Sequence, residues 1–347
     1  MPVTLKDIAQ KAGVSHSTVS RALNGKRVIS NETIQRIQKV AEEMGYSPSA
    51  AARALKTNRS RVLGVVLSNI DDPFFSEILQ GIEDGIRKTG YSLFIAAAHR
   101  DSAREHEIVK AMAEHRAGGV IICSTSFSED QSGQLLQYGV PIVVINNQAA
   151  EDFRYSIYHD DIDGSRQVAR HLIELGHRRI AYLGNAVSGR TTLDRLTGLR
   201  QEMESNGLTI PAEYIHEAPG GNPEHGIEAS NYFMKLSSPP TAIFCFNDML
   251  AIGVLKGMHQ LGIRIPDDIS ITGFDNIIFS AFTDPPLTTL DQPKHFIGTE
   301  AARLLLDLLN TKTATENPET ENVRVLKGKL LVRASTSAPS AKISETR

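Results

Sequence analysis

The chain has 347 residues, a formal net charge of −3, and a composition that is 41% hydrophobic and 22% charged. This length is enough for two or three compact units with their own cores. No basic-plus-apolar leader and no apolar run of membrane-spanning length occurs, so we expect a cytoplasmic protein without a membrane partner. Cys123 and Cys245 lie in apolar runs and are expected to be buried free thiols.

The small net charge hides an asymmetry along the chain. Residues 1–61 hold 11 Lys and Arg against 4 Asp and Glu, or +7, whereas the remainder holds 26 against 36, or −10. A basic head on an acidic body is typical of a phosphate-binding module attached to a domain that does not bind nucleic acid. A nucleic-acid interface is therefore expected within the first 61 residues.

Residues 3–25, VTLKDIAQKAGVSHSTVSRALNG, predict two short helices joined by a tight turn. Thr4 and Asp7 form a T-x-x-D capping pattern, and Gly13 supplies the left-handed residue of the turn. The second helix, capped by Ser15, turns small polar side chains and one arginine outward, which suits base reading in the major groove. From this pattern alone, an ordinary helical hairpin with a solvated face is the alternative.

A third helix is predicted from residue 31 to 44, capped by Ser30 and ended by Gly45. After it comes an alanine-rich segment, residues 50–56, that reads AAARALK. A helix this short is marginal on its own, so we expect it to become ordered only on DNA. A plain linker helix with a core leucine is the alternative.

From residue 61 onward, apolar strands alternate with amphipathic helices. The strand-like runs are VLGVVLSN, YSLFIAAA, GVIICS and PIVVIN, and after residue 160 RRIAYLG, YIHEA, TAIFCFND and ISITGFDN. Apolar strands that alternate with helices indicate parallel sheets covered on both faces. We therefore predict two similar α/β lobes, around 62–160 and 161–290, and a frayed tail from Ser335.

Polar residues that follow the predicted strands are candidate ligand contacts, because ligands bind beyond the carboxyl ends of parallel strands. Asp72 would equally serve as a helix cap, and Asp248 is expected to cap its helix. Phe74 and Phe75 are adjacent, so at least one is expected to face a cleft. Amides, carboxylates and an arginine near aromatic rings suit a polyhydroxylated ligand. The candidates are Asp72, Phe74, Phe75, Asn146, Arg195, Asn247, Asp275 and Gln292.

The motifs TLKDIAQKAGVSHSTVSRALNG, GYSPSAAARALK and LLVRAST, in this order, resemble the bacterial transcription regulators of the lactose- and galactose-repressor type, the LacI/GalR family. The resemblance implies an all-α helix-turn-helix DNA-binding domain with a hinge helix, followed by an α/β two-lobe effector domain of the type I periplasmic-binding-protein fold. Its implied boundaries are 1–48 for the helix-turn-helix domain, 49–60 for the hinge helix and linker, 61–335 for effector binding and dimerisation, and 336–347 for a flexible tail. Within 61–335, the first lobe would take 61–160 and 291–322, and the second 161–290 and 323–335.

The resemblance also implies roles for individual residues. The base readers would be His16, Ser17 and Arg21, and the phosphate contacts would be Thr4, Thr18, Ser20 and Asn24, with capping as the alternative for Ser20 and Asn24. In the hinge, Ala52 would let two helices pack in the groove, Leu55 would wedge between base pairs, and Lys56 would reach the minor groove or backbone. The candidate ligand contacts above carry over as effector contacts. One departure concerns residues 220–222, where many relatives place an aromatic ring that stacks on the ligand and this chain has none.

We therefore expect a repressor of a carbohydrate-utilisation operon that leaves a pseudo-palindromic operator when a sugar-like effector binds. A purine-type co-repressor or a protein partner is the alternative. A homodimer is expected, because the tail has no leucine heptads that could form a larger bundle. A solute-binding protein would need an export signal, and a sugar-processing enzyme would need a phosphate loop or a paired acid and base, so we expect neither, nor any metal or other cofactor.

Overall fold

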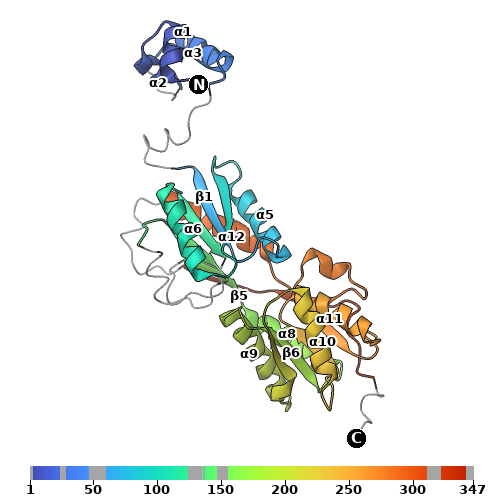
Figure 1. Ribbon diagram of the computed structural model, residues 1–347. Helices are drawn as coiled ribbons and strands as arrows, with labels where there is room; N and C mark the ends of the chain where they lie inside the picture. Colours follow the sequence, from blue (N-terminus) through green and yellow to red (C-terminus); the bar gives the residue numbers. More distant parts are fainter. Residues whose placement is uncertain are drawn as a thin grey trace. The chain divides into compact units, whose positions relative to one another are not determined.

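The computed structural model describes residues 3–23, 29–46, 60–123, 135, 137–146, 155–310 and 322–340. The chain divides into two compact units, Met1–Ser60 and Arg61–Arg347 (Figure 1). The second unit begins where the sequence places the start of the effector domain. Asn24, Ala52, Leu55 and Lys56 lie outside the described residues, as do nearly all of the predicted hinge and linker.

The first unit is a three-helix domain around a small apolar core. Its helices are α1 (Leu5–Ala12), α2 (His16–Leu23) and α3 (Asn31–Glu43). Thr4 caps α1 in a capping box with Asp7, and Gly13 ends it in the left-handed region at φ 64°, as the sequence predicts. One side chain from each helix, Ile8, Val19 and Ile37, is fully buried between them.

The second unit contains two six-stranded sheets, one in each lobe (Figure 1). The first sheet has the order β11-β5-β4-β3-β1-β2 and all its strands are parallel. Its strands are β1 (Val62–Leu67), β2 (Ser92–Ala97), β3 (Gly119–Cys123), β4 (Ile142–Ile145), β5 (Tyr155–His159) and β11 (Asn322–Leu326). The second has the order β12-β10-β9-β8-β6-β7, parallel except for the β10–β12 pair. Its strands are β6 (Ile180–Asn185), β7 (Ile215–Ala218), β8 (Ala242–Cys245), β9 (Ser270–Asp275), β10 (Thr288–Asp291) and β12 (Lys329–Leu331).

Helices cover these sheets in closely packed pairs, α5 with α12, α8 with α9 and α10 with α11. Their bounds are α5 (Pro73–Ile86), α6 (Ser102–Glu114), α8 (Asp161–Glu174), α9 (Arg190–Ser205), α10 (Pro223–Met234), α11 (Asp248–Gln260) and α12 (Lys294–Asn310), with short 3-10 turns η1 (Ala212–Tyr214) and η2 (Ile278–Ala281). Gly81 brings the α5 backbone against α12, since a Cβ there would lie 2.1 Å from the carbonyl oxygen of His295. Among the described helices, none is long and apolar enough to cross a membrane.

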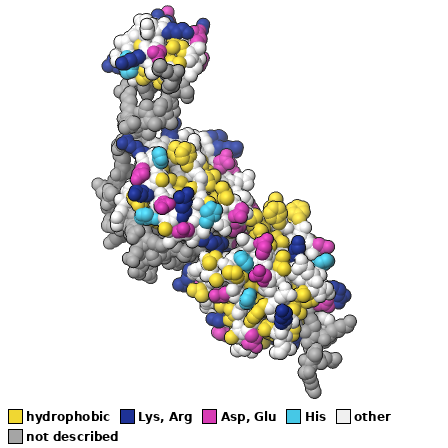
Figure 2. All heavy atoms as spheres, viewed as in Figure 1, with side chains coloured by type: hydrophobic (Ala, Val, Ile, Leu, Met, Phe, Trp, Pro, Cys, Tyr) yellow, Lys and Arg dark blue, Asp and Glu magenta, His cyan; other side chains and the backbone are white. Residues whose placement is uncertain are grey.

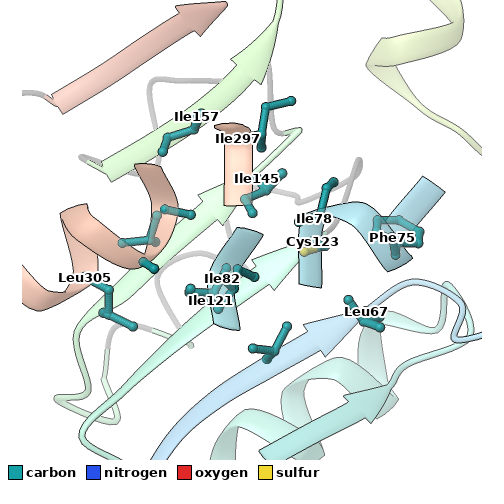
Figure 3. Packing of buried hydrophobic residues seen from close by; sticks show 14 of the residues in the cluster. Leu67, Phe75, Ile78, Ile82, Ile121, Cys123, Ile145, Ile157, Ile297 and Leu305 are labelled. Atoms are coloured by element: carbon teal, nitrogen blue, oxygen red, sulfur yellow. The ribbon is translucent and has the colours of Figure 1, made fainter. Parts of the chain in front are cut away.

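The core of the first lobe lies between its sheet and α5 and α12 (Figure 3). Phe74 and Phe75 are both buried in this core and meet edge to face, with ring centroids 5.3 Å apart. Two adjacent aromatic side chains thus both join the core, which the sequence did not predict, and their roles as effector contacts stay predictions. Ile277 of the second lobe completes the same cluster, so the apolar core continues across the two lobes. Both cysteines are buried free thiols, as predicted.

One boundary between the lobes differs from the prediction. The sequence assigns 323–335 to the second lobe, but β11 pairs in parallel with β5, with Val323 opposite Ser156, and so belongs to the first sheet. The chain crosses at residues 327–328 and then adds β12 antiparallel to β10. Two consecutive apolar runs of similar composition thus complete two different sheets, which their sequences alone do not distinguish.

The predicted flexible tail is also wrong for residues 335–340, which pack on the second lobe. The fully buried Ser335 hydroxyl donates to the Ile271 carbonyl at 2.6 Å and accepts from the Thr288 backbone amide at 2.8 Å. The backbone amide of Ser337 donates to the Ser270 hydroxyl at 3.0 Å. The polar composition of this segment suggested a solvated tail. Its serines instead form hydrogen bonds with β9 and β10. The predicted tail beyond residue 340 lies outside the described residues.

Candidate functional site

The free face of α2 carries the predicted base-reading side chains. His16, Ser17 and Arg21 are exposed, whereas Thr18 and Ser20 are half-buried. The helix is positioned by Val19, which is fully buried in the three-helix core. The three exposed side chains form a polar and cationic face that can reach base edges. The two half-buried side chains project less far from the domain.

Serine and threonine hydroxyls fix the starts of the first two helices. The Ser15 hydroxyl accepts the Thr18 backbone amide at 3.2 Å and lies 2.8 Å from the Thr18 hydroxyl. The Thr4 hydroxyl donates to the Asp7 carboxylate at 2.7 Å, and this bond lowers the pKa of Asp7. Thr4 therefore caps α1 and Ser15 caps α2 with Thr18 as its partner, and the phosphate contacts of Thr4 and Thr18 stay predictions.

In the second lobe, strand order brings the predicted ligand contacts to one edge. Strands β10, β9 and β8 are neighbours and parallel, so their carboxyl ends lie side by side. Asp275 ends β9, Asn247 follows β8, and Gln292 follows β10. All three side chains are buried, and the Gln292 amide donates to Asp275 Oδ1 at 2.6 Å.

Arg195 of α9 joins this group as its central cation. Its guanidinium lies 3.6 Å from Asp275 Oδ1 and 3.5 Å from Asp161 Oδ1. The guanidinium carbon is 4.3 Å from the ring centroid of Phe246 and 3.8 Å from that of Phe274, and the group also donates to the Phe246 carbonyl. Two carboxylates and two aromatic faces thus compensate the burial of one arginine.

Asp275 has strongly perturbed acidity. Burial raises the pKa of its carboxyl well above the usual range, Arg195 opposes this rise, and the charges of Asp248 and Asp72 add to it. Both protein contacts fall on Oδ1, and within the described parts of the chain Oδ2 makes no hydrogen bond. Asp275 can therefore accept a hydrogen bond from a bound hydroxyl group, or donate one when protonated.

Asp248 does not cap α11 as the sequence suggests. The cap is Asn247, whose side-chain oxygen accepts from the Leu250 amide at 2.9 Å. Asp248 turns into the lobe instead, where its carboxylate accepts from the Ile277 amide at 2.8 Å and the Thr289 hydroxyl at 2.5 Å. Burial raises the pKa of Asp248 to about 7.

The first lobe contributes fewer polar groups. Asp72 caps α5, with its Oδ1 accepting from the Phe74 amide at 3.0 Å, and burial raises its pKa. Asn146 follows β4 in the left-handed region at φ 62° and is half-buried. Arg100, in the loop after β2, reaches across the lobes and donates to the Ser188 hydroxyl at 3.1 Å.

The structure thus brings together Arg195, Asp275 and Gln292, with Asn247 beside them and Asp72 near enough to shift the pKa of Asp275. It encloses Phe74 and Phe75 in the core. Sequence reasoning missed several groups in or near this network: Asp161, Lys294, Arg100 and the rings of Phe246 and Phe274. It also missed Asn185, which is buried at the end of β6 outside the network. Lys294 could have been found from its place just after the β10 candidates; it is buried and donates to the Asp275 carbonyl at 2.6 Å. Within the described residues, no group of three or more His, Cys, Asp or Glu side chains could hold a metal ion.

This combination, a helix-turn-helix unit and a two-lobed parallel α/β unit with buried polar groups at its strand ends, is that of a ligand-binding DNA regulator. Residues 4–49 match the family described as bacterial regulatory proteins, lacI family, and residues 169–336 match the periplasmic binding protein-like domain. The HTH-type transcriptional repressors PurR of Actinobacillus pleuropneumoniae and Mannheimia succiniciproducens are 32% and 33% identical to this chain. These alignments cover 91% of the chain and 94% of the first relative, and 90% and 93% for the second.

Solved structures agree with these matches. A Lac repressor dimer bound to operator and the anti-inducer ONPF has a TM-score of 0.87 at 26% identity, covering 97% of this chain and all of that one. A complex of the transcriptional regulator CelR with cellobiose has a TM-score of 0.72 at 26% identity, covering 96% and 99%. The chain belongs to the lacI family of bacterial regulatory proteins and is a DNA-binding transcriptional repressor.

Proposed function

We propose that this repressor controls carbohydrate-utilisation genes and leaves its operator when a neutral sugar binds at the carboxyl edge of the second-lobe sheet. The observation that carries the proposal is the Asp275–Arg195–Gln292 group, in which a carboxylate, a guanidinium and an amide converge. Such a set bonds hydroxyl groups, which both donate and accept. It is poorly suited to an anionic ligand, because Arg195 is already paired with Asp161 and Asp275.

A purine is the second candidate, because the PurR relatives are named for it. A flat base would need aromatic faces to stack on, and the positions that could offer them are unfavourable here. Phe74 and Phe75 are enclosed in the core, the ring faces of Phe246 and Phe274 lie against Arg195, and residues 220–221 are both glycine. Support from this site therefore favours the sugar.

A thermal-shift screen with the full chain tests the proposal. D-Glucose, D-galactose, D-ribose, cellobiose, hypoxanthine and guanine would each be added, followed by fluorescence anisotropy on an operator selected from random duplexes. A sugar present at about a hundred times its dissociation constant should stabilise the protein by about 2.7 kcal/mol and release the operator. Stabilisation by hypoxanthine or guanine with tighter DNA binding would instead establish co-repression, and would overturn the sugar proposal.

In this proposal a homodimer binds the operator. Figure 2 shows hydrophobic side chains reaching the surface over both lobes, and large exposed ones include Ile278, Phe279 and Phe282 at η2 and Phe94 and Ile95 on the edge strand β2. Phe282 is 82% exposed, which is unfavourable for so large an apolar side chain in a monomer. Light scattering should give twice the 37.9 kDa chain mass, and Phe282→Ser should shift it toward the monomer. A monomeric or tetrameric wild type would refute the dimer.

The proposal keeps the hinge as the second DNA contact. Leu55 would wedge into the minor groove, since an apolar side chain can unstack one base step and allow added contacts. Leu55→Ala should then weaken binding to the selected operator strongly but leave the salt-dependent binding to random DNA nearly unchanged. Equal losses on both DNAs would exclude a wedge at this position.

A further inference from the structure

The turn after β6 holds a buried side chain outside the group described above. Asn185 ends β6 and is fully buried. Its backbone amide donates to the Thr192 hydroxyl at 3.1 Å, its carbonyl accepts from the Ser188 amide at 3.1 Å, and its side-chain oxygen accepts from the Val187 amide at 3.3 Å. The two backbone bonds hold the turn. The Val187 bond orients the side-chain amide, because flipping it would place an N–H against the Val187 N–H.

The side-chain nitrogen of Asn185 takes part in none of these bonds. Within the described residues, Asn185 Nδ2 has no hydrogen-bond partner and is shielded from solvent. A buried donor without an acceptor costs about 1–3 kcal/mol, and nearly all such groups in folded proteins are bonded. A bound molecule that offers an oxygen to this nitrogen would recover that cost, so the amide is prepared for an acceptor.

The glycine pair of the β7–α10 loop is fitted to the same amide. A Cβ at Gly221 would lie 3.0 Å from Asn185 Nδ2 and 3.1 Å from Asn247 Nδ2, so glycine lets the loop backbone lie against both nitrogens without displacing them. A Cβ at Gly220 would lie 2.7 Å from Cε1 of His225, whose buried Nδ1 also lacks a partner among the described residues. At the place where many relatives have an aromatic ring, the loop of this chain lies against nitrogen-bearing side chains.

The strand order of the second sheet places Asn185 at the same edge as the proposed sugar-binding group. β6 neighbours β8, and β8 neighbours β9, so Asn185 and Asp275 end strands that are two spacings apart, about 10 Å. This is the separation of the two strand ends. A single sugar ring with hydroxyl groups on opposite sides fits between contacts that start from these ends better than a disaccharide does.

We propose that Asn185 is a specificity-determining effector contact, donating from Nδ2 to an oxygen on the far side of a one-ring sugar whose near side is held by Asp275 and Arg195. This inference rests on the proposed sugar response. The second lobe would then contact one sugar ring from two sides, through charged groups at β9 and through a neutral amide at β6. Gly221 leaves the space beside the Asn185 amide free of a side chain.

The variant Asn185→Asp tests the donor directly. Aspartate keeps the size of the side chain and an acceptor for the Val187 amide but lacks both N–H donors. Titrations at alkaline pH keep the buried carboxyl ionised, so that it cannot donate to the ligand. D-Glucose, D-galactose, D-ribose and cellobiose would be titrated by calorimetry into the full-length wild type and the variant. We expect a monosaccharide to bind the wild type, with at least a tenfold higher Kd for Asn185→Asp. The matched control is Asn231→Asp, at an exposed amide of α10, which should change the Kd less than twofold.

A second variant distinguishes the loss of a ligand contact from a loss of sugar binding caused by a disturbed structure. Gly221→Ala leaves Asn185 in place but would put a methyl group 3.0 Å from its nitrogen, so it should also weaken sugar binding. Deoxy analogues of the bound sugar supply the sharper readout, because one analogue, lacking the contacted oxygen, should bind wild type and Asn185→Asp equally well. Both variants should retain operator binding and a two-state melt without sugar.

The outcomes separate this inference from the proposed function. Sugar binding with a tenfold loss in Asn185→Asp and one equalising deoxy analogue supports the contact. Sugar binding that is unchanged in Asn185→Asp, or equally reduced for every analogue, overturns the contact while the sugar response stands. Binding of cellobiose but of no monosaccharide overturns the one-ring ligand. If no sugar binds the wild type, the proposed effector class is wrong and this inference is wrong with it.

Discussion

The two lobes have the same plan and different chemistry at their strand ends. In the first lobe, the start of α5 buries Phe74 and Phe75 in an apolar cluster. In the second, the equivalent edge buries Arg195 between Asp161 and Asp275, each of which is paired with it. Duplicated architecture therefore does not imply duplicated function, because recognition depends on the residues at the edge and not on the sheet behind it.

This difference indicates a division of labour. Buried charges need partners at fixed distances, so the polar edge of the second lobe is rigid and selective. Apolar contact is non-directional, and the first-lobe core meets the second lobe through apolar side chains, Ile277, Met249 and Ile252. The second lobe would then select the ligand, while the first lobe closes against it with little chemical preference.

The largest effect is expected at Arg195. Arg195→Ala would leave Asp161 and Asp275 buried without their shared cation, which should lower the free energy of unfolding by about 3–5 kcal/mol and abolish the sugar response. Urea unfolding and operator-release assays measure the two effects. Arg200→Ala, at an exposed position of the same helix, is the control and should change neither. If Arg195→Ala lowers the free energy of unfolding by less than about 1 kcal/mol and responds normally to sugar, the second lobe does not select the ligand as proposed.

The next effect concerns pH and Asp248. Its pKa rises from 3.8 to about 7 on folding because of burial, so the folded state binds its proton more tightly than the unfolded state. Stability from this group is therefore present at low pH and is lost as the pH rises from about 4 to about 7. Relative to Asp248→Asn, the wild type should lose about 3 kcal/mol between pH 4.5 and pH 7.5, as measured by urea unfolding. Parallel pH profiles of the two proteins would contradict this account.

The smallest effect is expected at the contact between the lobes. Arg100→Ala removes the hydrogen bonds to the Ser188 hydroxyl and the Val187 carbonyl, which should cost about 1 kcal/mol. Because these bonds hold the lobes in one relative position, their loss should lower the population of that state and raise the Kd of the bound sugar about fivefold. Arg104→Ala, which removes only a surface pair with Glu107, is the control. An unchanged Kd would mean that the contact does not favour the binding conformation.

Much of the fold could be predicted because apolar strands and amphipathic helices alternate in the sequence, and because caps such as Thr4 and Asp72 have local signatures. The meeting of Asp275 and Gln292 followed from their positions after neighbouring strands. Asn185 was not predicted, since its importance depends on bonds to Thr192 and Val187 that the fold creates.

Other errors share one cause: the partner lies far away along the chain. Phe74 and Phe75 are buried in a cluster that includes Ile277 of the other lobe, more than two hundred residues later. The packing of Ser335 depends on the ends of β9 and β10, whose edge is open to it only after the sheet has formed. A pattern of local hydrophobicity carries no information on such contacts.

The placement of β11, β12 and residues 335–337 has a consequence for synthesis on the ribosome. β11 forms an edge of the first sheet, β12 forms an edge of the second, and the serines beyond it seal the ends of β9 and β10. Translation proceeds from the N-terminus, so domains normally complete one after another as they emerge. Here the first lobe lacks a strand until residues 322–326 have been made, and the second until residues 329–331 have been made. The DNA-binding unit therefore emerges long before either half of the sensor that controls it is complete.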